Sequence, residues 1–154
     1  MGHSIRLFNR FDSDPVAVLM HRNKNNDMLI SETDLQAKRH MKILEQKQKL
    51  TGYKLYVLEV DGKVTGYADC QVAGKDAVLH DLYVDPSLRG RGFGGKLMDS
   101  MLKFFTDSKC MNVQTEIQPA DHYKKKLVVA ADFSVESRKP GREIWAKDLS
   151  GMWP

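Results

Sequence analysis

A glycine-rich segment between an apolar run and an amphipathic run carries the strongest chemical signal in this chain of 154 residues. Residues 79–84 (LHDLYV) suit a buried strand, and Asp85-Pro86 turns the chain. A strand that leads through glycines into a helix presents main-chain N–H groups at the helix N-terminus, where phosphate groups bind well. The segment therefore predicts a loop that wraps a diphosphate, and its glycines are Gly90, Gly92, Gly94 and Gly95.

Three phosphate-binding motifs compete for this loop. A Walker A loop fits from Gly90 to Lys96, but Leu97 follows in place of the Ser or Thr that holds Mg²⁺. A dinucleotide fingerprint fits three of the glycines, with Glu116 about twenty residues further on. That fingerprint turns tightly out of its strand, whereas here residues 85–89 intervene, so we favour the third motif.

The segment resembles the coenzyme A loop of the GNAT superfamily of N-acetyltransferases, whose signature is Gln/Arg-x-x-Gly-x-Gly/Ala. Arg89, Gly92 and Gly94 match it, and residues 82–86 (LYVDP) look like the family's fourth strand and its exit. The resemblance is specific only over residues 78–98, although the order of expected elements extends it over nearly the whole chain. An Arg/Gly loop that only contacts solvent or RNA is disfavoured, because the glycines join a strand to a helix.

The resemblance implies transfer of an acetyl group from acetyl-coenzyme A to a primary amine, by direct attack on the thioester. It also implies that main-chain groups hold the cofactor: the Leu82 N–H would polarise the acetyl oxygen, and the Val84 backbone would bond the pantetheine arm. We expect no metal. The predicted cofactor-binding residues are Leu82, Tyr83, Val84, Arg89, Gly90, Arg91, Gly92, Phe93, Gly94 and Gly95.

Two side chains are candidates for the general base. His80 stands where family members often carry Glu, and a histidine with a pKa near 6.5 is a competent base at neutral pH. Strand alternation predicts that His80 shares a face with Leu82 and Val84, while Asp81 faces the other way. A purely structural histidine is an equal alternative. Glu116 on the next strand is the second candidate, and a water chain without a single base is the third.

The general acid is where the sequence departs from the family pattern. The family often has Tyr five residues before the Phe of a Gly-Phe pair, and here that position is Val128, because Asp132-Phe133 replaces Gly-Phe. The family's Asn position falls on Asp121. Tyr123 is the nearby hydroxyl and becomes the candidate acid if its helix is shifted. The run Lys124-Lys125-Lys126 indicates a solvated helix face.

Periodicity and turn signals predict the elements that must position these residues. Asp61-Gly62 is a two-residue hairpin turn. Helices are expected from residues 12–15, from the capping-box residues 31–34 to about Lys49, after the glycine-rich loop, and at 120–130. The result is a single layered α/β domain over residues 1–154, with a GNAT-like mixed, largely antiparallel sheet of about seven strands and about four helices. The strands are predicted at residues 3–8, 54–60, 63–72, 77–84, 111–117, 132–138 and 142–149.

Composition excludes several classes of protein. The longest wholly apolar stretches, residues 16–20 and 127–131, are too short to span a bilayer, and no secretory signal is evident. Cys70 and Cys110 stand far apart and indicate reduced thiols in a cytoplasmic protein. The net charge of +4 and the basic second helix permit, but do not specify, an acidic partner.

The expected partner is an amine-bearing small molecule, or a protein lysine or N-terminus, with no membrane; a homodimer is left open. Two other function classes remain. A GNAT-fold sensor would bind acyl-coenzyme A without transferring it, and the substituted Val128 keeps this class open. A nucleic-acid-directed protein, either a binder or a base-amine modifier, is permitted by the pI near 9 but has no dedicated motif.

Overall fold

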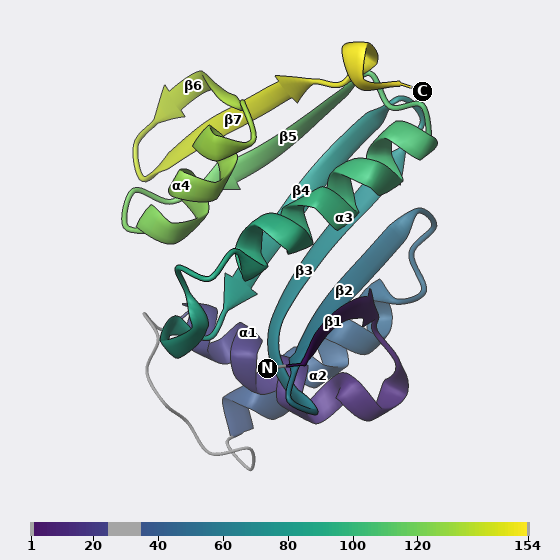
Figure 1. Cartoon of the computed structure of the whole chain (residues 1–154), viewed down its shortest axis with the longest axis vertical. Helices are drawn as coiled ribbons and strands as arrows, with labels where there is room; N and C mark the ends of the chain where they lie inside the picture. The colour runs from purple at the N-terminus through teal and green to yellow at the C-terminus, as the bar shows by residue number, and fades with distance from the viewer. Residues whose placement is uncertain (1, 25–34, 154) are drawn as a thin grey trace.

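Seven strands form one mixed sheet in the order β1-β2-β3-β4-β5-β7-β6 (Figure 1). This computed structural model describes residues 2–24 and 35–153. Neighbouring strands are antiparallel except β4 and β5, which run parallel. The strands are β1 (His3–Leu7), β2 (Tyr53–Val60), β3 (Lys63–Ala73), β4 (Asp76–Val84), β5 (Asn112–Ile117), β6 (Ser134–Lys139) and β7 (Arg142–Asp148).

In the described part of the chain, four α-helices cover the two faces of the sheet. The helices α1 (Ser13–Lys24) and α2 (Leu35–Lys47) lie on one face, and α3 (Phe93–Asp107) and α4 (His122–Ala130) lie on the other (Figure 1). In the described ranges, no helix has the length and apolar character to cross a membrane. The predicted α/β fold, with its mixed seven-stranded sheet and four helices, is confirmed.

Each face of the sheet has its own apolar core. The larger core lies under α3 and α4, and Leu97, Met101 and Phe105 enter it from α3 at spacings of four residues. That spacing puts the three side chains on one face of a helix, which explains why this sequence is helical here. The smaller core lies under α1 and α2 and includes Leu19 and Leu44.

Most predicted boundaries agree with the structure within two residues. Asp61 and Gly62 have φ of 51° and 79°, the left-handed pair that a two-residue hairpin turn requires. The helix α4 begins at His122 instead of residue 120, because the Asp121 side chain accepts the Lys124 N–H at 3.0 Å and caps the helix. The predicted capping residues 31–34 lie outside the described residues.

The strand β4 carries one extra residue relative to β3. The register pairs Asp69 with Asp81 and then Cys70 with Leu79, which leaves His80 without a Cα partner on β3. This arrangement is a β-bulge, which bends a strand and increases its twist.

The bulge also changes which side chains share a face. Leu79, Leu82 and Val84 all lie in the larger core, whereas Tyr83 lies in the smaller one. The prediction that His80 shares a face with Leu82 and Val84 is therefore wrong, because the extra residue shifts the alternation by one position.

Beyond the bulge, β4 and β5 separate. Their register runs from Asp76 and Asn112 to Leu79 and Thr115, where the Thr115 hydroxyl donates to the Leu79 carbonyl at 2.7 Å. From there β4 continues beside β3 to Val84, whereas β5 diverges visibly from β4 (Figure 1).

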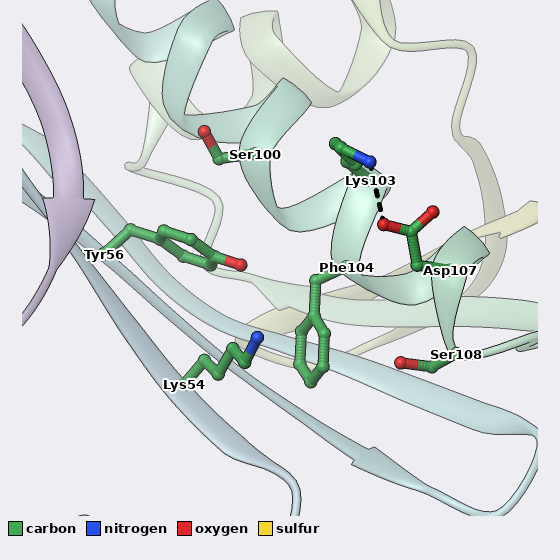
Figure 2. A pocket seen from close by; sticks show the side chains of 7 residues that line it. All are labelled: Lys54, Tyr56, Ser100, Lys103, Phe104, Asp107 and Ser108. Carbon is green, nitrogen blue, oxygen red and sulfur yellow. Dashed lines mark hydrogen bonds and ion pairs between the residues drawn. The ribbon is translucent and has the colours of Figure 1, made fainter.

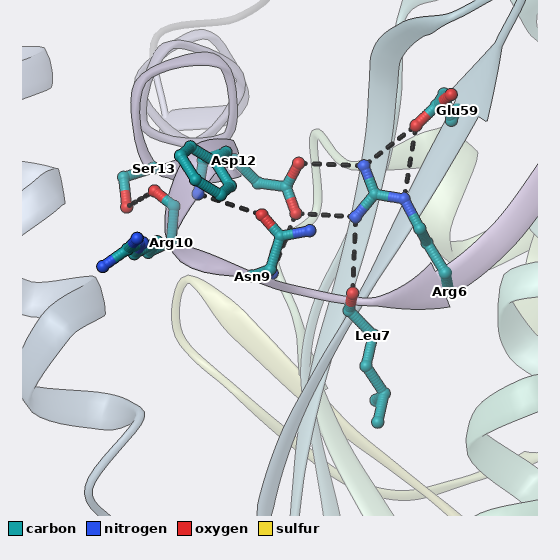
Figure 3. A network of polar contacts seen from close by, with 8 residues as sticks. Arg6, Leu7, Asn9, Arg10, Asp12, Ser13 and Glu59 are labelled. Carbon is teal, nitrogen blue, oxygen red and sulfur yellow. Dashed lines mark hydrogen bonds and ion pairs between the residues drawn. The ribbon is translucent and has the colours of Figure 1, made fainter.

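Arg6 ties β1 to the short 3₁₀ turn η1 (Arg10–Asp12) and to β2 (Figure 3). Its guanidinium donates to both carboxylate oxygens of Asp12, at 2.7 and 2.9 Å, and to Glu59 at 2.9 and 3.2 Å. The Asp12 side chain is only 5% exposed. Burial raises the pKa of Asp12, but hydrogen bonds from Arg6 and the Asn9 backbone outweigh it and hold that pKa below its usual value.

Replacing Arg6 with Met should destabilise the protein, because it leaves the Asp12 carboxylate buried without its ionic partner. We expect the free energy of unfolding at pH 7 to fall by about 2 kcal/mol, measured by urea denaturation. The matched control is Lys103→Met, which removes an exposed ion pair with Asp107 and should change stability by less than about 0.5 kcal/mol. Equal effects of the two substitutions would contradict this account.

Candidate active site

The glycine-rich loop leaves β4 through a tight turn. The Asp85 side chain caps η2 (Pro86–Leu88) by accepting the Ser87 N–H at 3.0 Å and the Ser87 hydroxyl at 2.8 Å. Arg89 then donates from Nε to the Val84 carbonyl at 2.8 Å. These local hydrogen bonds fix the direction in which the chain approaches α3.

Glycines complete the loop at the N-terminus of α3. Gly90 and Gly92 have φ of 83° and 86°, which glycine adopts without the strain that a Cβ would add. Gly92 is the N-cap residue, and α3 begins at Phe93. The first N–H groups of a helix lack intrahelical partners and favour anions, so this loop has the geometry of a phosphate site.

The main chain of β4 points two N–H groups toward the side that β5 has left. The Asp85 N–H donates to Thr65 on β3 at 2.8 Å. Because N–H direction alternates along a strand, the N–H groups of Val84 and Leu82 point to the opposite edge. The two positions that the resemblance assigns to the thioester and the pantetheine arm therefore present donors at the diverging edge of β4.

A cavity of about 870 Å³ opens where β4 and β5 diverge, and we call it the β4–β5 pocket. All three predicted catalytic residues line it, as does Arg89 from the loop. Its walls come from α1, α2, β4, the loop after β4, β5 and α4. The lining residues are Asn23, Lys24, Lys47, Val78, Leu79, His80, Asp81, Arg89, Glu116, Gln118, Ala120, Asp121, His122, Tyr123 and Lys124.

His80, the bulged residue, lies beside the ring of Tyr53, with the two ring centroids 6.5 Å apart. Burial lowers the pKa of His80 below its usual 6.5, although the charges of Asp69 and Asp81 oppose the shift. The imidazole is consequently neutral at pH 7, the form that accepts a proton.

Two aspartates that sequence analysis did not select, Asp69 and Asp81, lie close enough to His80 to act on its charge. Asp69 is fully buried and accepts hydrogen bonds from the Tyr53 hydroxyl at 2.7 Å and the Asp81 N–H at 2.9 Å. Burial, followed by the charge of Asp69, raises the pKa of Asp81. The available sequence signal was a carboxylate at the centre of β3, between the small or apolar residues Ala68 and Cys70. Across residues 2–24 and 35–153, the His, Cys, Asp and Glu side chains form no cluster of three suited to a metal ion.

Glu116 comes from β5 on the opposite wall of the pocket. Its side chain is about half exposed and lies 3.4 Å from the Arg142 guanidinium. The pocket thus brings His80 and Glu116 to one space from two different strands.

Tyr123 points toward the glycine-rich loop. The Arg89 guanidinium lies 4.5 Å from the Tyr123 ring centroid and 5.1 Å from that of Tyr83. Burial raises the pKa of Tyr123, while the charge of Arg89 and a hydrogen bond from the Gly94 backbone lower it. The hydroxyl therefore contacts the start of α3, and Val128, at the family's Tyr position, is fully buried in the larger core.

Lys124 does not lie on a solvated helix face, which corrects the prediction from the lysine run. Only 4% of the residue is exposed. Its Nζ donates to the carbonyls of His80 and Glu116, at 2.9 Å each, and so crosses from β4 to β5 where the strands have separated. Lys125, by contrast, is one-third exposed and pairs with Glu143 at 3.1 Å.

A second cavity of about 490 Å³ lies between β2 and α3 (Figure 2). The Lys54 ammonium lies 4.2 Å from the Phe104 ring centroid, and Lys103 pairs with Asp107 at 2.8 Å. The described residues that line it include none of the predicted site residues, so the chemistry concentrates in the β4–β5 pocket.

The sequence model of the acetyltransferase (GNAT) family matches residues 22–128, and the chain belongs to that family. No curated protein matches the sequence significantly. Among solved structures, the PaiA N-acetyltransferase of Thermoplasma acidophilum in complex with coenzyme A is similar, with 14% identity and a TM-score of 0.78 over 96% of this chain and 99% of that one.

Two other N-acetyltransferase structures share the fold. The ribosomal-protein-S18-alanine N-acetyltransferase of Escherichia coli is 20% identical, with a TM-score of 0.71 over 97% of this chain and 95% of that one. An N-acetyltransferase of Staphylococcus aureus Mu50 is 18% identical, with a TM-score of 0.76 over 97% and 99%. At these identities the likeness establishes the fold.

Two adjacent glycines in the first turn of α3 should respond oppositely to alanine. A Cβ on Gly94 would overlap the Tyr123 hydroxyl and lie 2.9 Å from a Leu127 methyl carbon, whereas a Cβ on Gly95 would meet no described atom within 4 Å. We expect Gly94→Ala to lower the free energy of unfolding by about 2 kcal/mol and Gly95→Ala to raise it by about 0.5 kcal/mol. Denaturation without cofactor measures both, and equal effects would contradict the packing argument.

Proposed function

We propose that this protein transfers the acetyl group of acetyl-coenzyme A to a primary amine, which attacks the thioester directly. The observation that carries the proposal is the separation of β4 from β5 immediately before the glycine-rich loop. It leaves main-chain donors at Leu82 and Val84 along a path that ends at the N-terminus of α3. An extended pantetheine arm with a diphosphate at one end matches that path.

Each part of the loop would have a role in binding the cofactor. The N–H groups of Gly90, Arg91, Gly92 and Gly95 would hold the diphosphate, and the Leu82 N–H would polarise the acetyl oxygen. Arg89 and Tyr123 stack beside the loop and would hold its shape, and Phe93 is buried beneath it. The family membership and the coenzyme A complex of the Thermoplasma acidophilum protein support this assignment.

His80 is the proposed general base, and Glu116 across the pocket is the alternative. The neutral imidazole of His80 lines the pocket that an acceptor amine would enter. The acceptor is a small-molecule amine, a lysine or a protein N-terminus; the last is included because the similar Escherichia coli enzyme acts on the alanine of a ribosomal protein. We place the protein in the cytoplasm, where its buried free Cys70 and Cys110 would stay reduced.

The direct test is isothermal titration with acetyl-coenzyme A, combined with a thiol-release assay over polyamines, aminoglycosides, amino acids, lysine peptides and N-terminal peptides. We expect binding and amine-dependent thiol release. Gly92→Val should weaken binding by about tenfold or more, because a side chain there narrows the diphosphate site.

The matched control is Gly62→Val, in the β2–β3 turn, which has a similar φ of 79° and should leave cofactor affinity unchanged. Binding without thiol release from any amine would favour the acyl-coenzyme A sensor. Absence of binding would contradict the cofactor assignment.

The pH dependence tests His80. Because burial lowers the pKa of His80, the imidazole becomes protonated only at some pH below 6.5, and the acidic limb of kcat/KM should lie below that value. His80→Gln should reduce kcat at pH 7 by about 100-fold and remove this limb. If Glu116→Gln removes the limb and His80→Gln leaves it, Glu116 is the base.

A further inference from the structure

Lys124 lines the β4–β5 pocket, where the reaction is proposed to occur. It bridges the His80 and Glu116 carbonyls, from the two strands whose separation makes the β4–β5 pocket. A lysine that is 4% exposed is unusual, because removing an ammonium from water costs several kcal/mol unless charges or hydrogen bonds compensate. Neutral donors could satisfy the two carbonyls without the cost of burying a charge. The buried Lys124 ammonium therefore indicates a further role.

The position of Lys124 on α4 suggests that role. Residues four apart lie on the same face of a helix, so Lys124 and Val128 stack one turn apart, and both are buried. Val128 occupies the place where the family often carries the tyrosine that protonates the leaving thiolate, and valine has no proton to give. Lys124 places a proton donor on the same helix face one turn earlier, at the gap between β4 and β5 that its Nζ bridges.

We propose that Lys124 is the general acid of the transfer, donating a proton from Nζ to the coenzyme A sulfur. This inference rests on the proposed acetyl transfer. The amine nitrogen forms a bond to the acetyl carbon, the C–S bond breaks, and its electron pair leaves on sulfur, which takes the Lys124 proton. The base takes the excess proton from the nitrogen and releases it to solvent, and Lys124 regains one proton from solvent, so the products are an amide and a free thiol and both groups are restored.

Burial and four nearby carboxylates act on the pKa of Lys124 in opposite directions. The carboxylates are Asp69 on β3, Asp81 on β4, Glu116 on β5 and Asp121 at the start of α4, and their charges raise the pKa of Lys124. Burial outweighs them and lowers that pKa, which makes the ammonium a better proton donor. Neutral His80 and the cations Lys24, Lys47 and Arg89 line the same pocket.

The proposal predicts a basic limb in the pH profile of kcat. An acid must be protonated to act, so activity should fall as the pH rises through the pKa of Lys124, below its usual 10.5. We expect Lys124→Met to reduce kcat by about 100-fold and to remove this limb. Lys124→Arg retains hydrogen-bond donors for the two carbonyls, but a guanidinium is a poor acid. We therefore expect this variant to reduce kcat by a similar factor.

A selenium analogue of the cofactor separates an acid from a structural bridge. Selenolate is a weaker base than thiolate and leaves without being protonated. With acetyl-selenocoenzyme A as the donor and the best amine of the panel as the acceptor, the loss caused by Lys124→Met should shrink to within about tenfold. Melting temperature and acetyl-coenzyme A affinity are measured for each variant. The control is Lys125→Met, which removes a partly exposed ion pair with Glu143 outside the pocket lining and should keep kcat within about twofold.

The outcomes are distinct. Equal losses with the thioester and the selenoester, or a basic limb unchanged in Lys124→Met, would overturn the role of Lys124 and leave a structural bridge. If the wild-type protein releases no thiol with any amine, the proposed function fails and this inference fails with it.

Discussion

The end of the parallel pairing between β4 and β5 is the constraint on which the site depends. Backbone N–H and C=O groups are costly to bury without hydrogen-bond partners. After Leu79 and Thr115 the two strands stop supplying those partners to each other. The Lys124 ammonium donates a hydrogen bond to one carbonyl of each strand. The N–H groups of Leu82 and Val84 point toward the side of β4 from which β5 has separated.

Burial favours the neutral form of three ionisable groups of the pocket, Asp81, His80 and Lys124. It raises the pKa of Asp81 and lowers those of His80 and Lys124. For Asp81 and Lys124 the shift moves the pKa toward neutral pH, and for His80 it keeps the imidazole in its neutral form at pH 7. Proton transfer is most efficient when the donor and the acceptor have pKa values near the working pH. The burial of these groups therefore affects how well they can transfer protons.

The glycines of one motif serve different physical purposes. Gly92 has a left-handed backbone and open space around its missing side chain, so its conformation requires glycine. Gly94 has ordinary helical geometry, but Tyr123 and Leu127 of α4 leave no room for a methyl group. The helix that bears Lys124 can therefore lie close to the loop. The same close packing connects the proposed diphosphate site to the proposed acid.

Local interactions determined much of this protein from the sequence alone. The Asp61-Gly62 turn, the α3 stripe and the glycine-rich loop depend on neighbouring residues, so spacing was enough to predict them. The bulge at His80 and the burial of Lys124 were not predictable in this way. Strand register is set by pairing with β3, and a lysine becomes buried only when α4 packs across two strands distant in sequence. Tertiary structure alone decided which face His80 takes and that one lysine of three turns inward.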